Sequence, residues 1–578
     1  MGRGEGIQED LETSPLHPKE RTTVTDTIDR PTSNLYGSGC EKNCEIELRN
    51  RIVPDMIRVA VVALLALSPL LGAQNVILFQ PDEMRAESLG CYGHPLVKTP
   101  NFDQFAKEGT RFDQAHVSYT VCSQSRVSFV TGWPTHVRGH RSLWALLHDD
   151  EPNLLKYFKN QSYTVFWRGK NDMLAHSSWN SSVTTARQMG GTNHGPNTFS
   201  QDDPRYYSFL SDPAVGGVST TQDYRNVAAA ISFLAKQPKD APFFIFLPLL
   251  LPHPPYSTIE PYYSMYDPET IPDLRPADLP DKPDYHHLIR QYRNITTLDT
   301  AFWKKLHAVY LGSISFSDYL FGLLLAAVDV HGFRDSTTVA VFADHGDYAG
   351  DYGLVEKWPS GLEDVLTRVP LIVRTPGGVQ GQVVHSPVQL FDIVPTLLDL
   401  ANIPLQHVQF GVSQKDVLLH GAHLADPNRS VFAEGGYNEP RDLEGDASTG
   451  GIPSKDNIYY PKSKQQQEKP LSVCRAASVR TSTHKLVVRT HPLDEDHDSE
   501  LYDLVHDPLE LHNVYGNASY AGVQSALKNK LFIWYMETSD VTPWNEDKRN
   551  GGYPWPPTIP AGDVGMDTSH GDDAHTYF

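Results

Sequence analysis

The chain contains 578 residues, and its 49 Lys plus Arg against 70 Asp plus Glu give a formal net charge of −21. The hydrophobic content of 39%, with 43 Pro and 41 Gly, is typical of a globular protein and excludes coiled-coil, collagen-like, wholly disordered and polytopic membrane proteins. The acidic balance also argues against nucleic acid as a partner, because the averaged field repels phosphates, although it is compatible with a local positive pocket.

The N-terminal part is predicted to lie outside the folded body. Residues 1–55 are polar and lack a sustained apolar period, so we expect a disordered extension. Residues 56–73 form a hydrophobic, signal-like segment, and its thirteen-residue core Val59–Leu71 is shorter than the roughly 18 residues of a membrane span, so no stable span is expected. Three interpretations stay open: a signal peptide from an internal start at Met56, a signal anchor, or a gene-model artefact. A working signal would place the protein in the secretory pathway, and without one it would be cytoplasmic.

Short apolar runs alternate with amphipathic stretches over residues 74–430. The runs that we predict as buried strands are Asn75–Phe79, Tyr163–Trp167, Pro242–Leu251, Thr337–Ala343 and Val369–Val373. The predicted helices include Tyr319–Val328, Gln389–Ala401 and a helix capped by Thr99 that ends at Gly109. This alternation predicts an α/β fold with a large, doubly wound, mostly parallel sheet that helices cover on both faces.

A smaller C-terminal subdomain is predicted over residues 431–541. Its first part, Asn438–Pro470, is polar and is expected to be a long loop. The later stretches SVRTS and KLVVRT alternate in the manner of a short antiparallel sheet. Residues 542–578 are rich in Trp, Pro, Gly and Asp, show no period, and are expected to form an irregular tail.

Acidic side chains follow two of the predicted strands. Asp82 and Glu83 come after NVILFQP, and Asp344 and His345 come directly after TTVAVFA. Adjacent acids on a turn are usually only solvated, but the carboxyl ends of parallel strands meet at one edge of a sheet, where active sites gather. The four residues together would form an oxygen-rich site with one imidazole, suited to Ca²⁺, with Mg²⁺ or Mn²⁺ as alternatives.

Cys122 opens the stretch CSQSR, which is followed by VSFVTG. A helix beginning there would put the cysteine in the partial positive field of its N-terminus, where a nucleophile or an anion is stabilised, whereas a lone cysteine is more often simply buried. Further candidates are Lys170 after Gly169, His253 between two prolines, and Lys357. A lone lysine or histidine is, however, more often an ordinary surface or core residue than a ligand.

The order of these segments resembles the sulfatase family of the alkaline phosphatase superfamily. The segments are NVILFQPDEMR, TPNFDQFAKEGTRFDQA, CSQSR, GK, LPHPPY and FADHGD with Lys357, followed by RVPLIVRTPG, QLFDIVPTLLDLANI and ELYDLVHDPLELHNV. Each motif is weak alone, and their joint order, over roughly three quarters of the chain, carries the resemblance. It implies an arylsulfatase-like sulfuric ester hydrolase that cleaves sulfate monoesters and depends on formylglycine.

The resemblance also implies a role for each matching residue. The catalytic residues would be Cys122, Arg126, Lys170, His253 and Lys357. The ligands of one divalent cation, usually calcium in this family, would be Asp82, Glu83, Asp344 and His345. The substrate would be contacted by Lys170, Asp172, His253 and Lys357. A modifying enzyme that generates formylglycine would oxidise Cys122 to the aldehyde (3-oxoalanine), whose hydrate attacks sulfur and releases sulfate by elimination.

Three positions depart from the pattern of the family. Gln124 stands where a proline is typical, which leaves open whether Cys122 is modified; an unmodified Cys122 would be a thiolate able to bind or attack phosphorus. Glu83 is one methylene longer than the common Asp, and Asp172 occupies a place that a histidine often holds. These departures leave two alternatives: a phosphodiester or phosphonate monoester hydrolase of the same superfamily, and a catalytically silent, sulfatase-like binding protein.

The organic part of the substrate stays open among aryl, choline and sugar sulfates. Residues 256–292, rich in Tyr, Pro and Asp with His286 and His287, would form either one wall of the pocket or an ordinary surface loop. The sequence does not indicate an oligomeric state.

Overall fold

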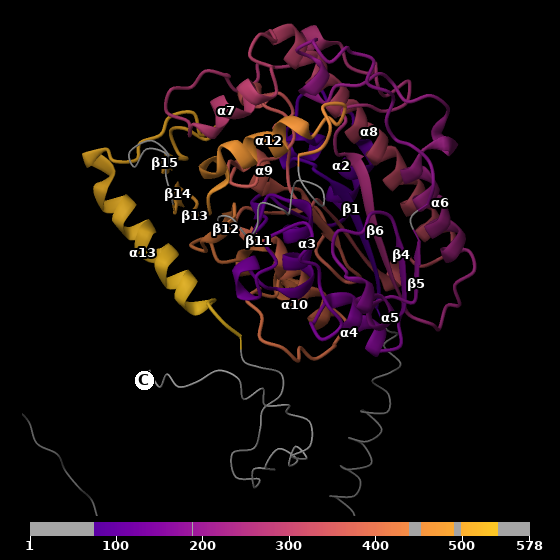
Figure 1. The fold of residues 1–578 in the computed structure, drawn as a ribbon. Helices are drawn as coiled ribbons and strands as arrows, with labels where there is room; N and C mark the ends of the chain where they lie inside the picture. Colours follow the sequence, from indigo (N-terminus) through magenta and orange to yellow (C-terminus); the bar gives the residue numbers. More distant parts are fainter. Residues whose placement is uncertain (1–73, 188, 438–451, 491–498, 542–578) are drawn as a thin grey trace, which may run out of the picture. The chain divides into compact units, whose positions relative to one another are not determined.

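The computed structural model describes residues 74–187, 189–437, 452–490 and 499–541 (Figure 1). The predicted extension 1–55, the signal-like segment 56–73 and the tail 542–578 lie outside the described residues, as do residues 438–451 of the predicted loop. The predicted α/β class with its additional small antiparallel sheet is confirmed.

The main sheet has eight strands, and among them β9 runs antiparallel to its neighbours while the other pairs are parallel. In spatial order they are β10 (Gln382–Val384), β2 (Thr110–Phe112), β9 (Leu371–Arg374), β7 (Thr337–Phe342), β1 (Asn75–Asp82), β6 (Phe243–Pro252), β4 (Thr164–Arg168) and β5 (Thr185–Arg187). The central strands β1 and β7 are buried along their whole length, as expected of a parallel sheet covered on both faces.

One predicted strand is divided. The run Val369–Val373 is split at Pro370, which cannot donate a ladder hydrogen bond. Its first residue belongs to β8 (Arg368–Val369), which joins β3 (Ala115–His116) and β11 (Val388–Gln389) in a three-stranded sheet, and the rest forms β9.

Helices cover both faces of the main sheet (Figure 1). One face carries α2 (Pro100–Glu108), α6 (Gln222–Leu234) and α8 (Thr300–Val330), and the other carries α3 (Cys122–Thr131), α4 (Leu154–Asn160) and α10 (Ile393–Leu400). By length and composition α8 could cross a membrane, but 72% of its most apolar window is buried inside the protein, as in a core helix. The shorter described helices are α5 (Trp179–Ser182), α7 (Tyr285–Tyr292), α9 (Asp364–Thr367) and α11 (Lys415–His420).

Helix α2 begins and ends where the sequence predicts, but Thr99 does not cap it through its side chain. The Thr99 hydroxyl instead accepts a hydrogen bond from the amide of Gly90 (2.9 Å) and donates to Asp103 (3.0 Å). Thr99 therefore ties the preceding loop to the helix.

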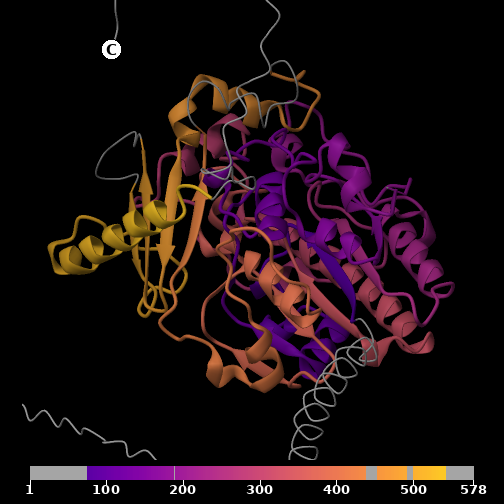
Figure 2. The ribbon, with the colours of Figure 1, turned by 90° about the horizontal axis from the view of Figure 1, so that it is seen from below.

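The second sheet is antiparallel and consists of β12 (Val431–Gly435), β13 (Ala476–Arg480), β14 (His484–Arg489) and β15 (Glu500–Asp503). Helix α13 (Ala521–Glu537) packs on it (Figure 2). The expectation of a loop through Pro470 is wrong for part of that stretch, because Tyr460–Glu468 forms helix α12. Pro461 in its first turn and the Lys, Gln and Glu residues that follow favour a helix despite the polar composition.

Candidate active site

The predicted site residues converge at the carboxyl ends of four neighbouring parallel strands, as expected for an open α/β sheet. Asp82 is the last residue of β1, Asp344 and His345 follow β7, His253 follows β6, and Lys170 comes two residues after β4. Gly169 makes the turn to Lys170 with a φ of +135°, and a Cβ there would lie 2.0 Å from the carbonyl oxygen of Pro248. Only glycine fits that close approach of two backbones.

Two acids share the buried guanidinium of Arg126. Its Nε lies 2.8 Å from Asp344 Oδ2, and its Nη2 lies 3.1 Å from Asp82 Oδ2. Burial alone would raise the pKa of Asp82, but Lys170 and Arg126 outweigh it and hold that pKa well below its usual value. Burial and the charge of Asp82 raise the pKa of Asp344. Arg126 therefore balances the charge of the acid pair, and its ion pairs are with these acids rather than with Cys122.

Glu83 reaches the same place through an unusual backbone. Its φ is +62°, and its amide donates to Asp344 Oδ1 (3.2 Å) while its carbonyl accepts from the Tyr310 hydroxyl (2.7 Å). Its Oε1 pairs with Lys357, whereas the buried Oε2 has no hydrogen-bond partner among the described residues, and the same holds for Oδ2 of buried Asp347. Burial raises the pKa of Glu83 well above its usual value. The two carboxyl groups also lie close enough to affect each other, so either a proton shared between them or a bound cation would satisfy these oxygens.

His345 presents the nitrogen that a metal ion would use. Its Nδ1 donates to the carbonyl of Gly346 (2.9 Å), so Nε2 carries the lone pair, and burial together with Lys357 holds the pKa of this imidazole well below its usual value. Nε2 lies 4.0 Å from Asp82 Oδ1 and 3.9 Å from oxygens of Glu83 and Asp344. Two carboxylates, Asp82 and Asp344, and the neutral imidazole of His345, all buried, therefore fit one divalent cation, with Glu83 Oε1 3.9 Å from His345 Nε2 beside them.

Cys122 is the first residue of α3 and faces this acid cluster. Its Sγ lies 3.2 Å from His345 Nε2, 3.5 Å from Lys170 Nζ and 3.7 Å from Asp82 Oδ1. Burial and the nearby Asp82 raise the pKa of the thiol, so the unmodified side chain is not a ready thiolate. The ligating atoms of Asp82, Cys122, Asp344 and His345 all lie within 4.8 Å of one another.

Two lysines, Lys170 and Lys357, line the same cavity as Cys122. Lys170 Nζ lies 2.7 Å from Asp82 and 2.8 Å from Asp172, and although burial lowers its pKa, these acids hold it well above its usual value. Lys357 Nζ contacts Glu83, lies 3.3 Å from Glu356 Oε1, and is 3.2 Å from His253 Nε2. Asp172 is therefore an ion-pair partner of Lys170 in this structure.

His253 is held as a neutral imidazole. Its Nδ1 donates to the carbonyl of Pro254 (2.5 Å), which directs Nε2 toward Lys357. Burial and the ammonium of Lys357 hold the pKa of His253 well below its usual value. His253 Nε2 is thus placed to accept a hydrogen bond from the ammonium of Lys357.

A cavity of 270 Å³ opens above Cys122. Its lining residues are Val121, Cys122, Leu143, Trp144, Lys170, Asp172, His253, Glu356, Lys357, Tyr459 and Lys462. Six of these residues were not predicted from the sequence, namely Val121, Leu143, Trp144, Glu356, Tyr459 and Lys462. Val121 adjoins Cys122 and Glu356 adjoins Lys357, while the other four come from distant segments that only the tertiary fold brings here. Residues 256–292 supply none of the lining, and His286 instead binds Glu363 (2.6 Å) in a buried network.

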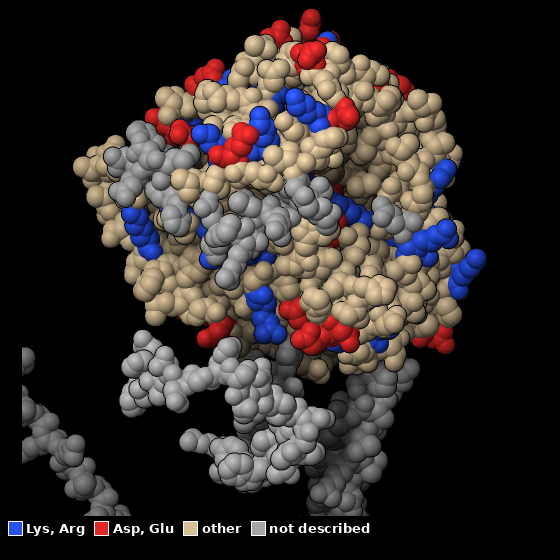
Figure 3. All heavy atoms as spheres, in the orientation of Figure 1, with Lys and Arg blue, Asp and Glu red and all other residues tan. Residues whose placement is uncertain are grey.

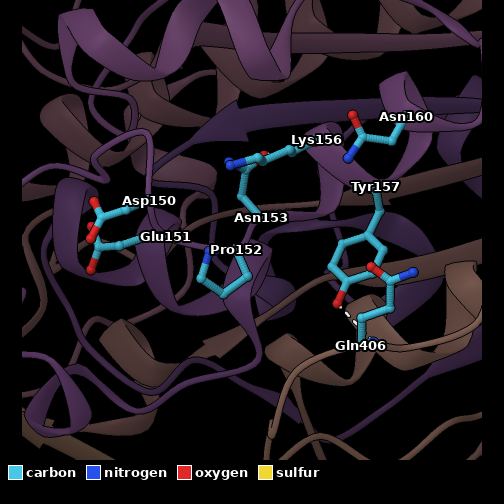
Figure 4. A pocket seen from close by; sticks show the side chains of 8 residues that line it. All are labelled: Asp150, Glu151, Pro152, Asn153, Lys156, Tyr157, Asn160 and Gln406. Carbon is cyan, nitrogen blue, oxygen red and sulfur yellow. Dashed lines mark hydrogen bonds between the residues drawn. The ribbon is translucent and has the colours of Figure 1, made fainter. Parts of the chain in front are cut away.

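A separate hollow of 180 Å³ contains none of the predicted site residues (Figure 4). Asp150, Glu151, Asn153 and Lys156 line it on one side, and the Tyr157 hydroxyl accepts a hydrogen bond from the amide of Gln406 (2.9 Å) on the other. None of its lining residues belongs to the groups of acids, cysteine and histidine that could hold a metal ion, whereas the cavity above Cys122 includes two members of those groups, Cys122 and His253.

The fold and this strand-end site are those of a hydrolase of the alkaline phosphatase superfamily, and comparison with known proteins defines the family. The sulfatase family matches residues 74–403, and the C-terminal region of N-sulphoglucosamine sulphohydrolase matches residues 426–535. Because the first match covers more than half of the chain, the chain belongs to the sulfatase family. The enzyme class predicted from the sequence, a sulfuric ester hydrolase, is thereby confirmed.

Relatives of known name are distant but match over most of their length. An uncharacterized sulfatase, YidJ of Escherichia coli, is 25% identical over 511 residues, covering 82% of this chain and 91% of the relative. Human iduronate 2-sulfatase is 27% identical over 515 residues, covering 77% and 92%. A solved phosphonate monoester hydrolase of Agrobacterium radiobacter superposes with a TM-score of 0.65 at 22% identity, covering 80% of this chain and 96% of that one, which shows a shared fold.

Proposed function

We propose that the protein hydrolyses sulfate monoesters of small organic molecules, using formylglycine made from Cys122 and one divalent cation, most simply Ca²⁺. The observation that carries the proposal is the placement of Cys122 Sγ between the ammonium of Lys170 (3.5 Å) and the buried cluster of acids and His345. A dianionic transition state needs a cation and ammonium groups around it, and this arrangement supplies both.

The cation would be held by Asp82, Glu83, Asp344 and His345, where it would polarise sulfate oxygens, and the hydrated aldehyde at position 122 would supply the attacking hydroxyl. The neutral state and the directed lone pair of His345 support this role. Arg126 would hold Asp82 and Asp344 in place between binding events and would favour the ionised form of Asp82.

The chain's own cations bind and orient the sulfate group. Lys170 and Lys357 both line the cavity and are paired with different acids, Asp82 and Glu83, so they would hold two different sulfate oxygens. Lys357 Nζ and His253 Nε2 are 3.2 Å apart, and this pair would lie near the leaving-group oxygen of the substrate. A proton must be delivered there to the departing alkoxide. The carboxylate of Asp172, which is paired with Lys170, partly neutralises the positive charge of that lysine.

Kinetics on matched substrates test the proposal. Purified protein with one bound cation should hydrolyse p-nitrophenyl sulfate with a higher kcat/KM than bis-p-nitrophenyl phosphate. Cys122→Ala should abolish turnover of both, while Cys91→Ala, which removes a free, partly exposed cysteine outside the cavity, should retain it.

The imidazole of His345 in the site favours hydrolysis of phosphorus esters as a second candidate function. A site with an imidazole ligand accepts Mn²⁺ or Zn²⁺ more readily than one made of oxygens alone, and the fold matches that of a phosphonate monoester hydrolase. A higher kcat/KM on the phosphodiester would therefore reverse the assignment. Turnover of neither substrate by cation-loaded protein that carries the aldehyde would indicate the silent binding protein.

Two further proposals concern the modification of Cys122 and the cellular location of the protein. Formation of the aldehyde requires a formylglycine-generating enzyme, or an equivalent, as a transient partner of the segment around Cys122. The protein follows the secretory pathway if residues 56–73 act as a signal, and is cytoplasmic otherwise.

A further inference from the structure

Trp144 is an exposed aromatic side chain at the rim of the catalytic cavity. It is 55% exposed and lines the cavity together with its neighbour Leu143. Singly exposed apolar side chains are common on protein surfaces, but Trp144 shares the lining of one cavity with Cys122, so a substrate that reaches Cys122 would pass beside the ring. The mechanism proposed above uses neither residue.

The loop that carries Trp144 is fastened to the helix of the nucleophile. Gln124 Nε2 donates to the carbonyl of Arg141 (2.8 Å), and Ser123 Oγ donates to the carbonyl of Leu143 (3.3 Å). Both donors closely follow Cys122 on α3. Gln124 stands where a proline is typical of the family, and proline has no side-chain donor, so this attachment is a feature of this chain.

The same loop is held from its other side by the second sheet. Arg141 forms a buried ion pair with Glu434 of β12, and Glu434 Oε1 also accepts from the Thr135 hydroxyl (2.8 Å). Contacts from α3 and from β12 therefore hold the backbone that carries Trp144 beside the cavity of Cys122.

The apolar surface beside Trp144 favours one kind of ligand. The three lysines that line the cavity, Lys170, Lys357 and Lys462, are paired with Asp172 or Glu356, so they present no unbalanced positive charge to a ligand. Leu143, next to Trp144, adds apolar surface to the same lining. A neutral ring with one flat apolar face can cover both side chains, whereas a quaternary ammonium is attracted by the indole alone.

We propose that Trp144 is a specificity-determining residue that stacks on the face of a six-membered ring in the organic part of the substrate. The inference rests on the proposed sulfate-ester hydrolysis and deepens it. Aryl sulfates and sugar sulfates share the required chemistry, a ring that bears the sulfate ester, whereas choline sulfate lacks it. Gln124 and Ser123 are positioning residues for the loop that carries Trp144.

Kinetics of Trp144→Ala on three substrates test the proposal: p-nitrophenyl sulfate, N-acetylglucosamine 6-sulfate and choline sulfate. For the ring substrate that the enzyme prefers, KM should rise about three- to tenfold with kcat nearly unchanged, as expected for the loss of one stacking contact. Trp144→Phe should restore most of the affinity, and KM for choline sulfate should not rise. The ring substrate whose KM rises more in Trp144→Ala shows whether the ring that stacks on Trp144 is an aryl group or a sugar. Phe532→Ala, at a 62% exposed aromatic on α13 outside this cavity, is the matched control.

An unchanged KM for both ring substrates in Trp144→Ala would overturn the inference while leaving sulfate hydrolysis intact. Failure of the wild-type protein on all three substrates would instead contradict the proposed function. A binding experiment separates the two results: Cys122→Ala should bind p-nitrophenyl sulfate more tightly than the Cys122→Ala/Trp144→Ala double variant. Equal affinities in that experiment would overturn the role of Trp144 whatever the activity.

Discussion

At the scale of single residues, the site consists of charges that are buried and balanced in pairs. Lys170 lies between Asp82 and Asp172, Lys357 pairs with Glu83, and Arg126 bridges two acids. Removing one partner of such a pair leaves the other charge uncompensated in a low-dielectric interior, which is costly unless an incoming ligand replaces it. A cation for the acids and a sulfate for the lysines would be such replacements.

Asp172 gives a test at this scale, because an entering sulfate must compete with it for Lys170. Asp172→Asn removes a carboxylate 2.8 Å from the ammonium, so KM for p-nitrophenyl sulfate should fall about three- to tenfold, with kcat within a factor of about two. Steady-state kinetics at constant ionic strength measure both parameters. Asp172→Glu keeps the charge and is the control.

A large loss of kcat in Asp172→Asn, with KM unchanged, would show instead that Asp172 takes part in proton transfer. The carboxylate would then have taken over the role of the histidine that many members of the family carry at this place.

At the scale of elements, the site depends on how strand ends are held. Asp223 at the start of α6 accepts hydrogen bonds from the amides of Leu250 (3.1 Å) and Leu251 (2.9 Å), just before β6 delivers His253. Asp223 is fully buried, and burial raises its pKa to about 6 from a reference value of 3.8. The helix therefore fixes the end of the strand through a carboxyl group that titrates near neutral pH.

The sign of the resulting pH dependence follows from linkage. A raised pKa means that the folded state binds the proton more tightly, so the stability from Asp223 is complete below about pH 3.8 and is lost as pH rises to about 6. In Asp223→Asn, the free energy of unfolding relative to wild type should increase by about 2 kcal/mol between pH 4 and pH 7. Urea unfolding at both pH values measures this change in the free energy of unfolding, and Asp335→Asn, at an exposed position, is the control. If the difference between Asp223→Asn and wild type does not change with pH, the raised pKa of Asp223 is contradicted.

At the scale of the whole molecule, two parts of the chain build one cavity. The main sheet supplies the residues around Cys122, and α12, in a stretch expected to be a loop, supplies Lys462 to the opposite wall. Acidic and basic side chains are interspersed in small groups on the face shown in Figure 3, so the net charge of −21 is not gathered there in one patch. An acidic protein can therefore still present lysines to an anionic substrate, because the acids beside them would be occupied by a cation.

The sequence is sufficient to predict the sheet and the strand-end residues for a physical reason. Strand Asn75–Asp82 contains the continuous apolar run Val76–Phe79, and the polar residues after such a run must lie at the carboxyl edge of the sheet, so the sequence pattern alone places Asp82 and Asp344 together. Trp144 and Lys462 cannot be placed in this way, because no local pattern marks them and only long-range contacts bring their segments to the cavity. Helix α12 was not predicted because its stretch carries almost no apolar period.

The state of residue 122 in active protein tests the central claim most directly. Peptide mass spectrometry of the segment around Cys122, after purification from the native host and confirmation of sulfatase activity, should find the mass of the aldehyde or its hydrate. The same peptide should react with a hydrazide reagent, while the peptide containing Cys91 should retain a thiol. An unmodified thiol at Cys122 in protein that turns over sulfate esters would contradict the formylglycine mechanism and, with it, the account of this site.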